Sequence, residues 1–470
     1  AREIEHQITP SQNTRLWVYE AEVGGKQYIN PIIRMKKGNA FSTALDNELA
    51  ESTIIHWHGL HVDHANDGHP ISQIEPLDEY QYNFEVENRA STYWYHTHAH
   101  RRTGIQAYHG LASFFIVEDD DEQNLTDSLD LNFGENDIPL VIQDKTFDSN
   151  GNLVYFQTPV DCSSGFLGDT VLTNLTYKPY LNVATRTYRF RILNGSNARI
   201  YRLAFTNDFS RSPFYVIGND GGLLTSPQEV TEVFLSPGER VDVLLDVSNN
   251  MLGETVWLKS LSFSDTTSFG MMNGGMCMAP DTALPNGSQF SILKLNVTQS
   301  TSYDKKIPSE LSSITPIDTD HAETRRFTLS FLHMLWLING QSFEMDRVPV
   351  TVTRGSKEVW EITNPSRTMG RGMGSMGMMS MPHPMHIHGF QFQVLQRVDS
   401  PSEVRRLAIN NNGLLPTDMG FKDTVLIWPG ETVRIAVDFS HNFPGRQLYL
   451  LHCHNLEHED NGMMMNYEVI

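Results

Sequence analysis

Five pairs of histidines in the pattern His-x-His constrain the fold of this chain more than any other feature. The chain has 19 histidines in 470 residues, and random placement predicts about 0.8 such pairs. On a β-strand, residues i and i+2 face the same way about 6.5–7 Å apart, so two imidazoles can bind one metal ion or one ion each of a close pair. The pairs are His56/His58, His96/His98, His98/His100, His386/His388 and His452/His454. They lie near both ends of the chain, so a site that uses them sits between the terminal parts, a favoured place for pockets.

Short runs of alternating apolar and polar residues recur along the chain, for example at 91–95, 188–193, 241–247 and 433–439. Clusters of Gly, Pro, Asn and Asp separate them, and few stretches keep a helical period. This pattern predicts an all-β protein, and short strands at regular spacing favour sandwiches or barrels.

Two shifts in composition divide the chain. An acidic run at 118–122, expected to be a solvated linker, follows a strand-like run, and a segment at 298–324 is rich in Ser, Thr, Asp and Pro. At about 150 residues per domain, the length predicts about three domains. We place them at residues 1–135, 136–300 and 301–470.

The charge balance excludes some partners. The chain has 35 Lys and Arg against 56 Asp and Glu, a formal net charge of −21. Nucleic-acid binders need a basic stripe and anionic membranes attract basic surfaces, so neither class fits. No apolar run reaches the ~18 residues of a membrane helix. Three cysteines cannot form a disulfide framework.

The segment 452–463 carries the most specific signal. It contains Cys453, His458 and Met463, which supply a thiolate, an imidazole and a thioether. With His383, they form the His₂Cys set with a weak axial Met that is typical of a blue-copper electron-transfer site. On a strand, His452 and His454 face the side opposite Cys453, where they can serve a second copper site. The alternatives are an inert buried thiol and a closed structural zinc site.

These motifs resemble those of the three-domain multicopper oxidases, a family of laccases, bilirubin oxidases and bacterial cuprous oxidases. The matching segments are His-Trp-His-Gly at 56–59, Tyr-His-Thr-His at 95–98, His-Pro-Met-His-Ile-His-Gly at 383–389, and 452–463. The resemblance implies three cupredoxin-like Greek-key β-sandwiches, of which the middle one binds no copper. Consistently, residues 138–298 contain no histidine.

The resemblance also implies four copper ions and their ligands. The implied ligands are His383, Cys453, His458 and Met463 for type 1 copper; His56 and His386 for type 2; and His58, His96, His454 with His98, His388, His452 for the two type 3 ions. A reducing substrate then gives single electrons to type 1 copper, and the trinuclear cluster reduces O₂ to water.

Reduction of O₂ needs protons. Asp67 and Glu459 match acidic positions that lie near the copper cluster in bacterial members of the family. We hypothesise that each carboxyl group relays protons. The alternative for each is a solvated surface carboxylate.

Two kinds of substrate are candidates for the reductant. Residues 369–381 read Met-Gly-Arg-Gly-Met-Gly-Ser-Met-Gly-Met-Met-Ser-Met and end two residues before His383. Thioethers favour Cu(I), so this segment suggests a cuprous oxidase whose substrate-entry residues are Met376, Met379, Met381, Glu344 and Met345. Alternatively the segment is a mobile lid over a pocket for phenols or aromatic amines, as in a laccase. An aspartate that precedes Met381 in cuprous oxidases is missing here.

Three other classes of protein are alternatives. A copper-storage protein without turnover would explain the Met and His residues, and a two-domain nitrite-reductase-like enzyme or a structural relative would lack some ligands. A second Met group at 271–278 is a further candidate Cu(I) site, and Cys277 could pair with Cys162.

Copper handling, the start at Ala1 and the family pattern favour the periplasm or an extracellular space, and we expect a monomer.

Overall fold

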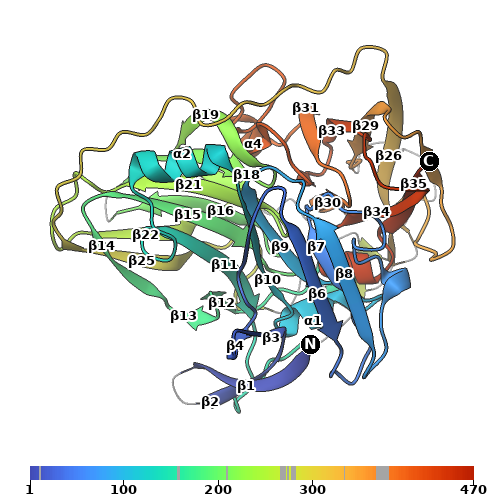
Figure 1. The fold of residues 1–470 in the computed structure, drawn as a ribbon, viewed down its shortest axis with the longest axis horizontal. Helices are drawn as coiled ribbons and strands as arrows, with labels where there is room; N and C mark the ends of the chain where they lie inside the picture. The colour runs from blue at the N-terminus through green and yellow to red at the C-terminus, as the bar shows by residue number, and fades with distance from the viewer. Residues whose placement is uncertain are drawn as a thin grey trace.

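The structure is a computed structural model that describes residues 1–9, 12–155, 159–207, 210–264, 271–272, 275–276, 282–332, 334–366 and 380–470. Of residues 159–160, 162, 271–272 and 275–276 it describes the backbone alone. Strands dominate, so the predicted all-β class is confirmed (Figure 1). No helix in the described ranges is long and apolar enough to cross a membrane.

The first part of the chain forms one four-stranded sheet in the order β5-β10-β9-β7 and three strand pairs, β1-β2, β3-β4 and β6-β8. The bounds are β1 (Arg2–Thr9), β2 (Gln12–Val18), β3 (Glu20–Val23), β4 (Lys26–Ile29), β5 (Ile33–Lys36), β6 (Ala40–Asp46), β7 (Ile55–His58), β8 (Glu79–Glu85), β9 (Ser91–Thr97) and β10 (Ala112–Glu118).

The middle part consists of a seven-stranded and a six-stranded sheet that share a core of aliphatic and aromatic side chains. The first contains β13 (Thr176–Tyr177), β12 (Thr170–Thr173), β11 (Asp137–Lys145), β15 (Thr187–Asn194), β21 (Arg240–Asp246), β18 (Phe214–Asn219) and β19 (Gly222–Val230). The second contains β14 (Tyr180–Ala184), β25 (Phe290–Gln299), β22 (Thr255–Ser260), β16 (Tyr201–Thr206), β17 (Arg211–Ser212) and β20 (Val233–Leu235). A separate pair joins β23 (Met271–Met272) to β24 (Gly275–Met276).

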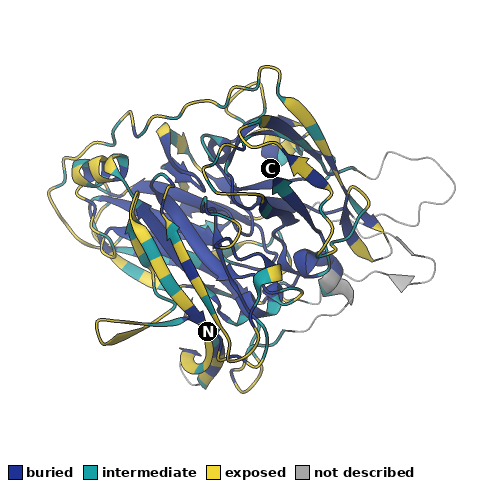
Figure 2. Ribbon diagram, turned by 45° about the vertical axis from the view of Figure 1, so that its right-hand side comes forward, coloured by how far each residue is buried: buried dark blue, intermediate teal, exposed yellow. Residues whose placement is uncertain are grey.

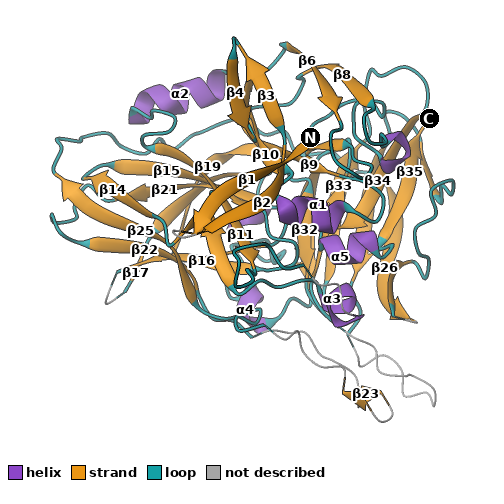
Figure 3. Cartoon of the chain, turned by 90° about the horizontal axis from the view of Figure 1, so that it is seen from below, coloured by secondary structure: helices purple, strands orange, loops and turns teal. Residues whose placement is uncertain are grey.

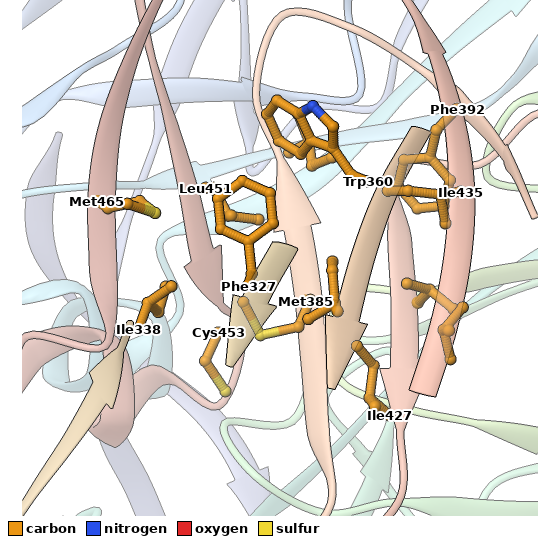
Figure 4. Packing of buried hydrophobic residues seen from close by; sticks show 14 of the residues in the cluster. Phe327, Ile338, Trp360, Met385, Phe392, Ile427, Ile435, Leu451, Cys453 and Met465 are labelled. Atoms are coloured by element: carbon orange, nitrogen blue, oxygen red, sulfur yellow. The ribbon is translucent and has the colours of Figure 1, made fainter. Parts of the chain in front are cut away.

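The last part has two five-stranded sheets. One contains β27 (Leu335–Ile338), β26 (Glu323–Leu332), β29 (Lys357–Thr363), β33 (Thr432–Asp438) and β31 (Phe392–Val398). The other contains β28 (Val350–Val352), β35 (Met464–Val469), β34 (Gln447–Cys453), β30 (His383–Ile387) and β32 (Thr424–Ile427). Their facing side chains form a core that includes Met385 and Cys453 (Figure 4).

Burial follows the two-residue period of a strand where one face meets water. In β22 the side chains alternate between partly exposed and buried, whereas every residue of β7 and β9 is buried. Figure 2 shows this contrast as continuous blue strands in the interior and banded strands at the surface. The histidine-bearing strands therefore lie inside the molecule. The domain limits at residues 135 and 300 stay a prediction.

Short helices connect the sheets: α1 (Thr103–His109), α2 (Asp120–Leu129), α3 (Pro159–Ser164), α4 (Ser402–Arg405) and α5 (Leu456–Asp460), with 3₁₀ turns at Pro70–Ser72 and Pro416–Asp418. Helices α1, α3 and α5 lie side by side (Figure 3). Asp460 in α5 accepts hydrogen bonds of 2.9 Å from the backbone N–H groups of Thr103 and Gly104. Glu457 in α5 accepts one of 2.7 Å from Asn197 of the middle part. Helix α5 thus joins all three parts of the chain.

The expectation of a solvated linker at 118–122 was wrong. Asp119 caps α2 by accepting a hydrogen bond from the Glu122 N–H, and acidic residues in the first turn suit the positive end of the helix dipole. Glu122 is buried and its carboxylate lies 2.5 Å from both Arg189 and Arg191.

Candidate metal centre

Strand pairing brings the four histidine segments together. In the first part β7 pairs antiparallel with β9, which places His56 opposite His96. In the last part β30 pairs antiparallel with β34, which places His386 opposite His452 and Met385 opposite Cys453. Because side chains alternate along β34, Cys453 points into the core of the last part, while His452 points toward the histidines of the first part.

Eight histidines form one buried cluster between the first and last parts: His56, His58, His96, His98, His386, His388, His452 and His454. Pairs of ring nitrogens approach closely inside it. The Nε2 atoms of His56 and His386 are 3.3 Å apart, and those of His388 and His452 are 3.0 Å apart. The pair His98/His100 extends outside this cluster, since the His100 ring lies beside Phe343 instead.

The chemistry of this cluster fits metal ions. Burial lowers the pKa of His96 to about 4 and that of His98 to about 3, and it lowers the pKa of His454 well below its usual range. Neutral imidazoles are the form that binds metal. Both ring nitrogens of His454 are buried and have no hydrogen-bond partner among the described residues. Such lone pairs are costly to bury unless an ion binds them.

Two aspartates each orient two of these rings, one through the backbone carbonyl and one through the carboxylate. The backbone carbonyl of Asp67 accepts a hydrogen bond from His56 Nδ1 at 2.6 Å, and its carboxylate accepts one from His388 Nδ1 at 2.8 Å. The carbonyl of Asp423 lies 2.8 Å from His386 Nδ1, and its carboxylate lies 3.0 Å from His58 Nε2. Such contacts fix the tautomer and the direction of a metal-binding imidazole.

The four histidines that contact Asp67 and Asp423 also stack in two pairs. His56 stacks on His388, and His58 stacks on His386, each with ring centroids 3.7 Å apart. His58 differs from the others because its Nε2 is engaged by Asp423 and its Nδ1 lies 3.3 Å from His96 Nε2. His58 therefore faces the cluster through Nδ1.

Both carboxylates that the sequence singled out lie at this cluster. Asp67 and Glu459 are at most 2% exposed, so the alternative of a solvated surface carboxylate is wrong for both. Burial, with a smaller contribution from Asp63, raises the pKa of Asp67 well above its usual value. The carboxylate of Glu459 lies 3.2 Å from His452 Nδ1 and 3.5 Å from His98 Nε2. Their role as proton relays stays a prediction.

A second group lies on the other side of β34. Cys453 Sγ is 3.5 Å from His383 Nδ1 and 3.6 Å from His458 Nδ1. Asn455 caps α5 and positions His458, while the Met463 N–H donates to the His458 carbonyl and the Met463 carbonyl accepts from the Cys453 N–H. Burial raises the pKa of the Cys453 thiol, so only a bound cation would make it a thiolate here.

Trp336, which is buried as well, packs against the two histidines of this second group. Its ring centroid lies 4.4 Å from that of His383 and 5.0 Å from that of His458. Its indole N–H donates to the Ser163 carbonyl at 2.8 Å, and His458 Nε2 lies 3.2 Å from the same oxygen. None of His383, Cys453, His458 and Met463 is exposed.

The substrate-entry candidates that the structure describes differ in how far they are buried. Met381 is buried in the core of the last part, whereas Glu344 is exposed and lies 3.9 Å from Arg347. Met345 is partly buried. Met376 and Met379 lie outside the described residues, as do Cys277 and the side chain of Cys162.

Comparison with known proteins defines the family. Models described as "Multicopper oxidase" match residues 4–122 and 309–470. A multicopper oxidase of Staphylococcus haemolyticus is 35% identical over 94% of this chain and 82% of its own length. A laccase of Bacillus stratosphericus is 31% identical over 97% of this chain and 91% of its own length. The crystal structure of McoA from Aquifex aeolicus is 41% identical, with a TM-score of 0.86 over 100% of this chain and 94% of that one.

This chain belongs to the multicopper oxidases. The full-length match confirms the three-domain all-β fold that the motifs imply. The two histidine groups match the type 1 and trinuclear copper sites of the family, so the protein is a copper oxidoreductase that uses O₂ and a reducing substrate. Sequence reasoning missed Asp423, because nothing in its local sequence distinguishes it from a structural residue.

Proposed function

We propose that the copper ligands are those implied by the motifs. His383, Cys453, His458 and Met463 hold type 1 copper, and His56 and His386 hold type 2 copper. The remaining six histidines of the cluster hold the two type 3 ions: His58, His96 and His454 hold one, and His98, His388 and His452 hold the other. Copper bound by these residues would supply one-electron oxidation of a reducing substrate and four-electron reduction of O₂ to water. The close groups of buried ring nitrogens and the thiol support this assignment.

The chain itself links the two sites. His452 and His454 flank Cys453 in sequence, so a few covalent bonds join the thiolate to two cluster histidines. This link supports turnover over storage, since a storage protein needs no path between sites. Asp67 and Glu459 stand beside the cluster and can hold and deliver protons without exposing it to water.

We propose Cu(I) as the preferred reductant, with small phenols as slower substrates. The observation that carries this choice is the complete burial of all four type 1 side chains, together with Trp336, which packs against His383 and His458. A phenol ring cannot contact a buried imidazole, whereas a metal ion needs only a small soft site nearby. The Met-rich sequence at 369–381, next to His383, supplies thioethers for such a site. The similarity to a laccase supports the second substrate class.

The test is a side-by-side measurement of kcat/KM on copper-loaded protein with Cu(I) and with 2,6-dimethoxyphenol, with O₂ uptake as the common readout. We expect turnover with both and a higher kcat/KM with Cu(I). A higher value for the phenol would make the enzyme a laccase, and no O₂ uptake with either would favour storage.

We also propose that the protein acts in the periplasm or outside the cell, because copper handling is a task of these compartments in the family. Fractionation of the source cells, with antibody detection of the protein, tests this location.

A further inference from the structure

Arg240 brings a fixed positive charge from the middle part of the chain to the histidine cluster. It begins β21, in the part without histidines, and is fully buried. Its Nη1 lies 2.8 Å from Asp423 Oδ1 and its Nη2 lies 2.6 Å from Asp423 Oδ2. This is the two-point geometry in which a guanidinium matches a carboxylate.

The guanidinium is itself held in place from two parts of the chain. Its Nε donates to the carbonyl of Thr92 at 2.9 Å, on the strand that carries His96. Its Nη groups donate to the carbonyls of Gly238 and Asp220 at 3.0 Å. Arg240 therefore connects all three parts of the chain at one point.

Asp423, held by Arg240, in turn orients two histidines. Its carboxylate accepts a hydrogen bond from His58 Nε2, so that His58 Nδ1 faces the cluster. Its carbonyl accepts from His386 Nδ1 and leaves Nε2 facing His56. Room around the carboxylate is tight, because a Cβ atom on Gly59 would lie 2.3 Å from Asp423 Oδ2.

The other aspartate of the cluster lacks this anchor. Asp67 makes the same pair of contacts, to His56 and His388, but its Oδ1 has no hydrogen-bond partner among the described residues. Each aspartate therefore holds two cluster histidines, and of the two, Asp423 is the one that an arginine clamps within the described part of the chain.

We infer that Arg240 is a positioning residue of the trinuclear copper site, which fixes Asp423 so that His58 binds through Nδ1 and His386 through Nε2. The middle domain, which supplies no copper ligand, thereby sets the geometry of both type 2 and type 3 copper. This inference rests on the proposed ligand assignment.

The test compares Arg240→Lys with the control Arg189→Lys in copper-loaded protein. Lysine keeps the charge and loses the two-point contact. Arg189 is equally buried in the same sheet and pairs with Glu122 and Asp242, away from the histidines. We expect Arg240→Lys to change the type 2 electron paramagnetic resonance signal and the type 3 near-ultraviolet absorption, to leave the blue type 1 absorption unchanged, and to lower kcat about 10–100-fold. Arg189→Lys should lower only the thermal midpoint.

Unchanged type 2 and type 3 spectra in folded Arg240→Lys would overturn the inference. If that variant does not fold, the isosteric Asp423→Asn variant decides by the same spectra, with the same two outcomes. A wild-type protein without type 2 and type 3 signals would instead overturn the ligand assignment itself, so the two failures are distinguishable.

Discussion

The carboxylate of Asp67 lies 2.8 Å from Nδ1 of His388, and both side chains are fully buried. The second carboxylate oxygen of Asp67 is unpartnered among the described residues. One oxygen therefore orients a histidine, and in the proposed relay the other oxygen would hold the proton.

Replacing Asp67 by Asn should lower kcat for O₂ reduction by about 10²-fold, because the amide can still contact His388 but cannot exchange a proton. Steady-state O₂ uptake measures the loss, and anaerobic stopped-flow reduction of the blue type 1 absorption should stay at the wild-type rate. Asp63→Asn is the matched control, since Asp63 is near Asp67 and contacts Asn66 rather than a cluster histidine. Equal slowing of both steps in Asp67→Asn would contradict a proton role.

Replacing Glu459 by Gln should slow O₂ reduction and leave type 1 reduction intact. Glu459 lies beside His98 and His452 but not beside the group around Cys453, so its loss should act on one site only. The comparison uses the same two assays, and Glu459→Asp, which keeps an acid at a greater distance, should recover part of the rate. If the Gln and Asp variants are equally slow, the carboxyl group matters for packing and not for protons.

Replacing Trp336 by Ala should open the type 1 site to aromatic substrates. The ratio of kcat/KM for 2,6-dimethoxyphenol to that for Cu(I) should rise, because the indole fills the space next to the His383 and His458 rings. The cavity should also cost about 3–5 kcal/mol of unfolding free energy. Trp360→Ala is the control, since Trp360 is buried in the same core against Phe327 and should lose stability without a change in the substrate ratio.

Replacing the five methionines of residues 369–379 by Leu should lower kcat/KM for Cu(I) and spare the phenol. The segment keeps its length and apolar character but loses its thioethers, the groups that favour Cu(I). Deletion of residues 369–379 provides a second variant. Unchanged Cu(I) oxidation in both would show that the segment is not a copper feeder.

Lys145 makes stability depend on pH away from the copper sites. Burial, partly opposed by Asp144, lowers its pKa to about 7, and its ammonium group lies 4.4 Å from the centre of the Tyr108 ring. Between this value and the unfolded value, the unfolded chain binds more protons, so the unfolding free energy rises with pH by up to about 1.4 kcal/mol per unit. The Lys145→Met variant lacks this pH-dependent contribution to the unfolding free energy. Its gain in thermal midpoint over wild type should be larger near about pH 6 than near about pH 9; a constant difference would contradict the shift.

The sequence predicts the histidine cluster because its members repeat at the two-residue period of strands, so local spacing carries the information. The resemblance to the multicopper oxidases also predicted that Asp67 and Glu459 lie near this cluster, and both do. The partnership of Arg240 with Asp423 could not be predicted, because it depends on how sheets of different parts dock across 183 residues of sequence. Helix α2 was missed because its acidic first turn resembles a solvated run, and its buried partners Arg189 and Arg191 lie far along the chain.

Helix α5 and strand β34 also determine the order in which the enzyme can assemble. A ribosome that has made the first domain has delivered His56, His58, His96 and His98, but the other half of the cluster does not exist until the chain has grown past His454. Docking of α5 against α1 and Asn197 then closes the three parts together. The histidine cluster can therefore be complete only after the last part of the chain has been made, so copper cannot bind the whole cluster earlier.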